Sequence, residues 1–106
     1  MKSKRSKACD IPQRVKDRVW ERDRHRCIIC HSPIAMPNAH VVARSDGGLG
    51  IEENIVTLCT NFSEGKCHYY YDFGTKEQRE NIGKQIEEYL KKKYPNWNKE
   101  KLIYRR

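Results

Sequence analysis

The chain has 106 residues, with 22 lysines and arginines against 14 aspartates and glutamates, and a formal net charge of +8. This length suits one small domain with a modest core, for which a bound metal is an expected supplement. No apolar run could span a membrane or serve as a signal peptide, so we expect a cytoplasmic protein with a nucleic-acid rather than a membrane partner.

The first nine residues are basic and contain two serines. We expect residues 1–9 to form a disordered tail, which either aids solubility or contacts phosphate groups. Cys9 lies in this tail, and we interpret it as a free thiol without a role.

A helix is predicted to begin near residues 10–12, where Pro12 is tolerated in the first turn. An apolar stripe of Ile11, Val15 and Val19 would pack on the domain. A basic ridge on the same helix would either follow a DNA backbone or face solvent, and it consists of Arg14, Arg18 and Arg22.

Four of the five cysteines are spaced for one metal ion. Cys27 and Cys30 form a C-x2-C turn, as in zinc knuckles. Seven residues separate Cys59 from Cys67, which we interpret as an enlarged loop, since loop length costs little entropy. In a reducing compartment this pattern favours structural Zn²⁺ over disulfides, with buried free thiols as the alternative. Zinc held by four thiolates would leave a net charge of about +6.

The stretch from Ala39 to His68 contains the residues best suited to catalysis. His40 lies in a short apolar run that predicts a strand, and a glycine-rich turn follows at residues 46–48. Asn54 then precedes a second strand-like run, residues 55–58. Two strands followed by a histidine-bearing segment can bring His40 and His68 to one site, and histidine can both accept a proton and bind a metal.

Helical segments are predicted after His68. Residues 69–74 favour one or two helical turns that end at the glycine, with His68 and Asp72 on one face. Thr75 and Gln78 match a capping box for a longer helix, which should end at residues 93–94 before a proline. The side chains that this helix should bury are Ile82, Ile86, Tyr89 and Leu90. A short turn from Asn98 should hold Leu102 and Ile103.

The order His40, Asn54, His68, together with the glycine turn and the cysteines, closely resembles the HNH endonucleases. The resemblance is strong over residues 27–74 and extends more weakly to residues 94–97, which are similar to small phage and prophage HNH proteins. It implies an α+β fold, with a ββα-metal (His-Me finger) core and zinc knuckle between an N-terminal and a C-terminal helix. The domain would span residues 10–106, including a helical segment at 75–106.

The resemblance also implies a function, that of a metal-dependent DNA endonuclease hydrolysing phosphodiester bonds. Its setting would be phage or prophage DNA processing or packaging, beside a terminase or other packaging proteins, in the cytoplasm of a bacterium or phage-infected host. His40 would be the general base, His68 a ligand of one divalent ion, and Asn54 the residue that pins the loop between the strands. The ion would be Mg²⁺ or Mn²⁺, with Ni²⁺ as a further option.

One position departs from the family pattern. Many members carry a second metal ligand just before the base, where this chain has Ala39. Asp72 is the best substitute, and its alternative role is that of a surface carboxylate at a helix end. Under this interpretation Ala39→Asp should restore a ligand. Arg44 is interpreted either as a phosphate contact or as solubilising charge.

Two other functions fit parts of the sequence. A non-catalytic zinc-binding module could use the same cysteines and basic residues to bind nucleic acid without cleaving it. A zinc hydrolase with an open cysteine and histidine site is less favoured, because four cysteines would close the coordination sphere.

Overall fold

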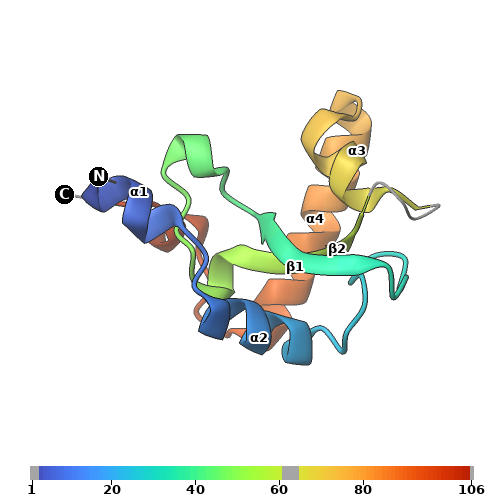
Figure 1. Ribbon diagram of the computed structural model, residues 1–106. Coiled ribbons are helices and arrows are strands. Elements are labelled where there is room, and N and C mark those ends of the chain that lie inside the picture. Colours follow the sequence, from blue (N-terminus) through green and yellow to red (C-terminus); the bar gives the residue numbers. More distant parts are fainter. Residues whose placement is uncertain (1–2, 61–64, 106) are drawn as a thin grey trace.

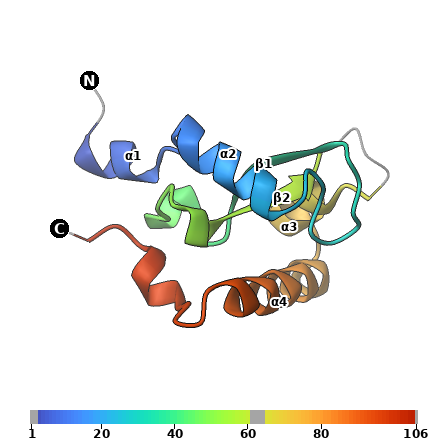
Figure 2. The ribbon, with the colours of Figure 1, turned by 90° about the horizontal axis from the view of Figure 1, so that it is seen from below.

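The computed structural model describes residues 3–60 and 65–105. Within them, the sheet has two antiparallel strands, β1 (Ala35–His40) and β2 (Ile55–Cys59). Helices α2 (Gln13–Arg22) and α4 (Lys76–Lys93) cover its two sides (Figure 1, Figure 2). The other elements are α1 (Lys4–Cys9), α3 (Cys67–Phe73), η1 (Arg44–Asp46), η2 (Glu52–Asn54) and η3 (Lys99–Leu102), where η marks a single-turn 3-10 helix. The chain is therefore a small α+β protein, as the sequence predicted.

Strand β2 is buried along its whole length because helices cover both of its faces. On one face, Val56 and Leu58 join a core cluster with Ile86 and Leu90 of α4. On the other face, Ile55 packs with Val15 and Val19 of α2, and Ile11 lies against them. A strand covered on both faces reads as a continuous apolar run rather than an alternating one. The predicted apolar stripes of both helices are confirmed.

Strand β1 contains a bulge. Met36 pairs with Leu58 and Ala39 with Val56, so two residues of β1 face one residue of β2. Pro37 lies in this interval, where its missing N–H removes a ladder hydrogen bond. Bulges bend a strand and redirect its side chains. Here Ala39 is buried in the core and His40 ends the strand, half-buried.

The N-terminal segment differs from the disordered tail that its composition suggested. Residues 4–9 form α1, in which the side chain of Ser3 caps the helix by accepting a hydrogen bond from the Ser6 N–H. Cys9 is only 2% exposed, and the carbonyl of Ala8 accepts a hydrogen bond of 2.9 Å from Gly50. Contacts with residues some 40 positions away order this segment, and no local sequence pattern encodes them. Residues 1–2 lie outside the described range.

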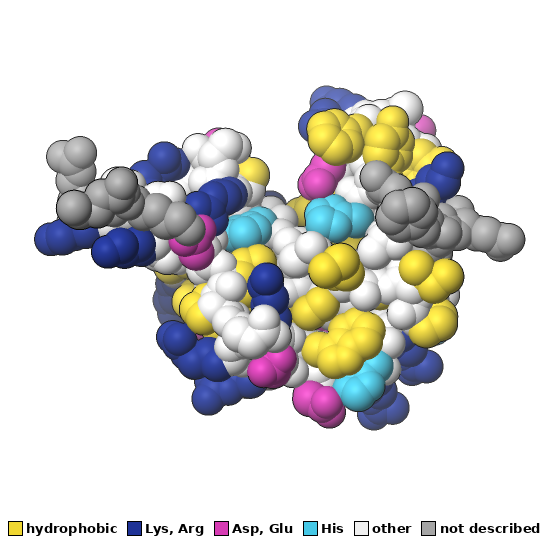
Figure 3. Space-filling model, in the orientation of Figure 1, with side chains coloured by type: hydrophobic (Ala, Val, Ile, Leu, Met, Phe, Trp, Pro, Cys, Tyr) yellow, Lys and Arg dark blue, Asp and Glu magenta, His cyan; other side chains and the backbone are white. Residues whose placement is uncertain are grey.

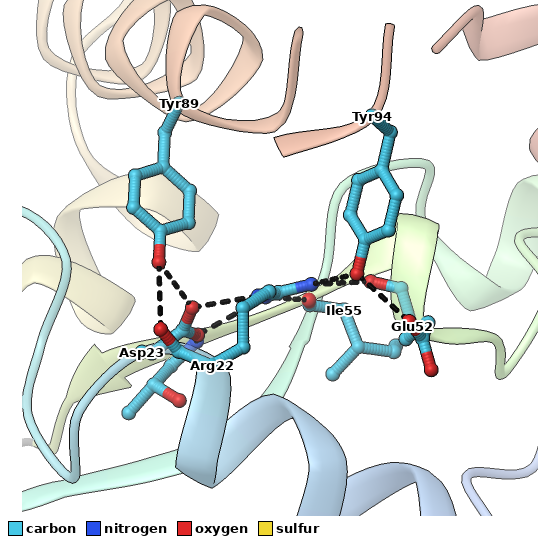
Figure 4. Close-up of polar contacts among 7 residues, drawn as sticks. Arg22, Asp23, Glu52, Ile55, Tyr89 and Tyr94 are labelled. Atoms are coloured by element: carbon cyan, nitrogen blue, oxygen red, sulfur yellow. Dashed lines mark hydrogen bonds and ion pairs between the residues drawn. The ribbon is translucent and has the colours of Figure 1, made fainter. Parts of the chain in front are cut away.

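Arg22 does not belong to an exposed basic ridge, in contrast to the sequence prediction. Its side chain is 11% exposed and forms an ion pair with Asp23, at 2.7 Å from Nε to Oδ1 (Figure 4). The guanidinium also donates to the carbonyls of Glu52 and Ile55, at 2.7 Å each. Burial alone would lower the pKa of Arg22, but the bonds to Asp23 outweigh it and raise the pKa. Arg22 therefore joins α2 to β2 and is not available to DNA.

Tyr89 of α4 completes this buried network, because its hydroxyl donates to Asp23 Oδ1 at 2.6 Å. We expect Tyr89→Phe to lower the free energy of unfolding by about 1.5–3 kcal/mol, the range for a hydrogen bond to a charged group. Urea unfolding at constant metal concentration measures this change. Tyr69→Phe is the matched control, since the Tyr69 side chain is exposed, and should have little effect. Equal effects in the two variants would contradict this role of Tyr89.

The other helix boundaries follow local signals in the sequence. Thr75 and Gln78 form the predicted capping box of α4, with hydrogen bonds of 2.8 and 3.1 Å. The side chain of Asn98 caps η3, which buries Leu102. Across residues 3–60 and 65–105, no helix is sufficiently long and apolar to cross a membrane.

Candidate metal centre and active site

The four cysteines predicted to share a metal converge, with their sulfur atoms all within 4.8 Å of one another. The cluster has two halves, Cys27 with Cys30 and Cys59 with Cys67. The second half comes together because Cys59 ends β2 and Cys67 begins α3. Cys27 and Cys30 lie in a tight turn, where Cys27 N donates to Ser32 O at 2.9 Å. The enlarged loop between Cys59 and Cys67, of which residues 61–64 lie outside the described range, does not separate the two halves.

The surroundings of the sulfurs fit a metal centre. Tetrahedral Zn²⁺ at a Zn–S distance of about 2.3 Å places its sulfurs about 3.8 Å apart. The Cys67 N–H points at Cys59 Sγ from 2.9 Å, the kind of hydrogen bond that stabilises a thiolate ligand. Gly65 lies directly against the cluster, because a Cβ there would be 2.9 Å from Cys30 Sγ. The backbone at Gly65 therefore lies so close to the sulfur atoms that a residue with a side chain would not fit there.

Three thiols of this cluster have pKa values that differ in the absence of a cation. A hydrogen bond from Cys67 lowers the pKa of Cys27 to about 4. The same hydrogen bond raises the pKa of Cys67, and burial raises the pKa of Cys30. A divalent ion would supply the positive charge that lets all four act as thiolates.

His40 lies at the end of β1, and one of its ring nitrogens forms a hydrogen bond with the protein backbone. Its Nε2 lies 3.0 Å from the carbonyl oxygen of Cys9, which can only accept a hydrogen bond. Nε2 therefore carries the proton, and Nδ1 of the neutral ring has the lone pair. Burial lowers the pKa of His40 below its ordinary value of 6.5, against the opposing effect of the Cys9 hydrogen bond. At neutral pH the ring is thus a neutral base.

No pattern in the sequence predicted the hydrogen-bond partner of His40. Cys9 contributes a backbone oxygen, and it does so from a segment that composition assigned to a disordered tail. Only the packing of α1 against the loop after β1 brings this oxygen to the imidazole.

His68 and Asp72 form the pair expected from their spacing on α3. Nε2 of His68 lies 3.2 Å from Oδ2 of Asp72, and the side chains are 27% and 45% exposed. Adjacent ligands of an octahedral ion with bonds of about 2.1 Å are about 3.0 Å apart, so one ion could bind both atoms. Two protein ligands would leave several positions for water or substrate oxygens.

His40 and Asp72 line the same open groove, which has a volume of about 890 Å³. Figure 3 shows a hollow in this face with histidine side chains beside it and an acidic side chain at its edge. Asp72 raises and His68 lowers the pKa of His40, which places all three within electrostatic reach. Among the described residues, only the cysteines converge as three or more metal ligands, so His40 stands apart from the His68–Asp72 pair.

Asn54 pins the loop between the strands, as predicted. Its side chain is fully buried, and Oδ1 accepts from Val42 N at 2.8 Å. Nδ2 donates to Val42 O at 3.2 Å and to Leu49 O at 2.8 Å. Because one amide holds both ends of the loop, it fixes the segment that follows His40. Whether catalysis depends on Asn54 remains a prediction.

Asn54→Asp should lower the free energy of unfolding by about 2 kcal/mol or more, since a carboxylate cannot donate to the Val42 and Leu49 carbonyls. This loss relative to the wild type is the stability deficit. Burial should raise the folded-state pKa of the new carboxyl above its unfolded value of about 3.9. The protonated form keeps one donor, so the deficit should grow as pH rises through that raised pKa. Urea unfolding of the variant and the wild type at mildly acidic and at neutral pH measures this. A deficit that does not depend on pH would contradict the assignment.

Ala39 cannot be replaced by a working ligand in the way that the family pattern suggested. Its side chain is fully buried and packs in the core cluster with Val56 and Ile86. A carboxylate there would lie in the core and lose its solvation. Asp72 is therefore the better-placed carboxylate for an ion at His68.

Of the remaining arginines predicted to bind nucleic acid, Arg14 and Arg18 lie one turn apart on α2, and Arg44 lies in η1. Arg14 and Arg18 are exposed on α2, and Arg18 lies 3.5 Å from Glu52. Arg44 forms an ion pair with Asp10 and donates to Ser6. Phosphate contacts by these three residues stay a prediction.

These features define a small α+β protein with a four-cysteine cluster that could hold a metal ion. Comparison with protein-family models, curated proteins and solved structures finds no match to this chain. Its activity is therefore inferred from its own residues and their geometry.

Proposed function

We propose that the protein is a metal-dependent DNA endonuclease of the HNH class, in which β1, β2 and α3 form the ββα-metal core. One observation carries the proposal: a neutral histidine with an available Nδ1 lines the same groove as Asp72, the carboxylate of a histidine–aspartate pair. The net charge of +8 supports a polyanionic substrate.

His40 would act as the general base. Its Nδ1 takes a proton from a water molecule, whose oxygen attacks the phosphorus of a phosphodiester. The bond from phosphorus to the 3′ oxygen breaks, and this oxygen gains a proton from solvent, which leaves 5′-phosphate and 3′-hydroxyl ends. A well-placed base contributes roughly 10²–10⁴-fold to such a reaction. The Cys9 carbonyl keeps the imidazole in the required tautomer.

His68 and Asp72 would hold the catalytic ion, for which Mg²⁺ and Mn²⁺ suit a site with one carboxylate and open positions. Such an ion supplies positive charge to the non-bridging and leaving oxygens as negative charge develops. Asn54 holds the loop after His40 in place, and the cysteine cluster, with Zn²⁺ as the proposed ion, fixes the start of α3 beside β2.

The groove itself is lined by both signs of charge, with four basic side chains, Lys76, Arg79, Lys84 and Lys99, beside five acidic ones. The attraction for a DNA strand would therefore come from the net charge of the whole protein and from the catalytic ion. Lys99 lies 3.6 Å from Glu87, a partly exposed ion pair of little intrinsic strength that phosphate groups would displace.

Incubation with supercoiled plasmid DNA tests the proposal. We expect nicking in the presence of Mg²⁺, Mn²⁺ or Ni²⁺, with none after addition of EDTA. Retarded but intact DNA under every metal condition would instead identify the non-catalytic zinc-binding module. The purified His40→Gln variant, prepared in parallel, controls for contaminating nucleases.

A further inference from the structure

A second hollow lies between α1 and η1, outside the groove described above. It has a volume of about 490 Å³ and is lined by two arginines, three serines and one cysteine: Arg5, Arg44, Ser3, Ser6, Ser45 and Cys9. Its lining is therefore rich in hydrogen-bond donors and positive charge. Guanidinium and hydroxyl groups in this combination are typical of phosphate recognition.

The two arginines are held in place by a reciprocal contact. Arg5 Nη2 donates to Ser45 O at 2.9 Å, so a side chain of α1 binds the backbone of η1. Arg44 Nη2 donates to Ser6 O and Oγ at 3.2 Å, so a side chain of η1 binds α1. Each guanidinium has five N–H donors, more than these bonds use. Both guanidinium groups are thus held in position, and each has further N–H groups that could donate to a ligand.

The local charge also favours an anion. One of the two guanidinium groups, that of Arg44, forms an ion pair with Asp10. Lys4 and Lys7 add exposed positive charge to the same short helix. Bringing like charges together costs free energy that a bound anion would offset.

The position of this hollow relates it to His40. Cys9 lines the hollow, and its carbonyl oxygen accepts the hydrogen bond from His40 Nε2. We propose that the hollow binds a backbone phosphate of a nucleic-acid strand, next to the phosphodiester presented to His40. The placement of this phosphate next to the reacting phosphodiester rests on the proposed nuclease function, whereas phosphate binding in the hollow does not.

Titration of the zinc-loaded protein with inorganic phosphate, followed by NMR without other divalent ions, tests the phosphate site. We expect saturable shifts of the Ser6 and Ser45 amides, lost in Arg5→Ala. Lys7→Ala is the matched control, because it removes the same charge from the same helix outside the hollow. Absence of saturable shifts in the wild type would overturn the proposal, and this titration needs no variant to fold. Ser45→Ala, a milder change, should weaken the shifts without removing a charge.

A second arm distinguishes a backbone phosphate from free phosphate. DNA affinity, measured by fluorescence anisotropy in EDTA-free buffer without added divalent ions, should fall in Arg5→Ala. Its logarithmic salt dependence should flatten by about 0.9, the value for one phosphate contact on duplex DNA. Arg5→Lys should restore part of the affinity.

Three outcomes separate the possibilities. Equal losses of DNA affinity in Arg5→Ala and Lys7→Ala would indicate a diffuse basic surface and overturn the site. Phosphate shifts with an unchanged salt dependence would overturn its assignment to the nucleic-acid backbone. Wild-type protein that gives the expected shifts and DNA binding, yet cuts no DNA with any metal, would keep the phosphate site and reject the nuclease.

Discussion

Cys59→Ser should unfold or aggregate the protein. Cys59 is fully buried at the end of β2 and holds the start of α3 through the Cys67 N–H. Structural zinc in small domains contributes about 10–16 kcal/mol at neutral pH. A whole domain is stable by only about 5–15 kcal/mol, so losing the proposed zinc would remove most or all of that stability. Circular dichroism and metal analysis of the purified variant measure the loss.

Cys9→Ser is the matched control for this prediction. Cys9 is equally inaccessible, at 2% exposure, but it lies outside the cysteine cluster. We expect this variant to keep its fold and about one zinc per chain after dialysis against EDTA. If a thiol reagent labels Cys27, Cys30, Cys59 and Cys67 rapidly in the native protein, the zinc assignment is wrong.

His40→Gln should reduce DNA cleavage by roughly 10²–10⁴-fold while zinc content, fold and DNA affinity stay unchanged. Glutamine can still donate to the Cys9 carbonyl, so α1 keeps its contact with β1. It has no basic nitrogen for the attacking water. The remaining activity should still need a divalent ion. Initial rates of plasmid nicking at saturating Mn²⁺ provide the measurement.

His68→Ala should affect cleavage in a different way. Because this residue would hold the ion, the variant should need a higher metal concentration for the same rate, and Asp72→Ala should behave as a milder version. If neither of these variants nor His40→Gln changes the rate, the observed cleavage comes from a contaminant. The binding-module interpretation would then be preferred.

The parts of the fold that the sequence predicted are those with a local signal. The four-residue spacing of Val15 and Val19, and the Thr75–Gln78 capping box, each act within one helix, and both appear in the structure. The role of Asn54 was also predictable, because an amide between a glycine-rich loop and a strand can satisfy backbone donors and acceptors together. Cysteine spacing predicted that these four residues converge despite the long loop, in a cluster that could hold a metal ion.

The features that were missed depend on contacts between distant segments. Arg22 looked like one of three exposed arginines, but α2 ends where its side chain can reach Glu52 and Ile55, some 30 residues away. Contacts with Ser45 and Gly50 hold the helix Lys4–Cys9 against the rest of the domain. Ala39 follows the bulge in β1 and is buried, whereas the family pattern had suggested that Ala39→Asp would restore a metal ligand there. Tertiary packing, rather than local preference, decides each case.

The central claim is that His40 acts as the general base and that His68 and Asp72 bind the catalytic ion. Calorimetric titration of Mn²⁺ into the zinc-loaded protein tests this claim most directly. Wild type and His40→Gln should bind one Mn²⁺ with similar affinity, because His40 stands apart from the pair. His68→Ala should bind it far more weakly. If His40→Gln abolishes Mn²⁺ binding while His68→Ala leaves it intact, the base and the ligand have been assigned to the wrong histidines.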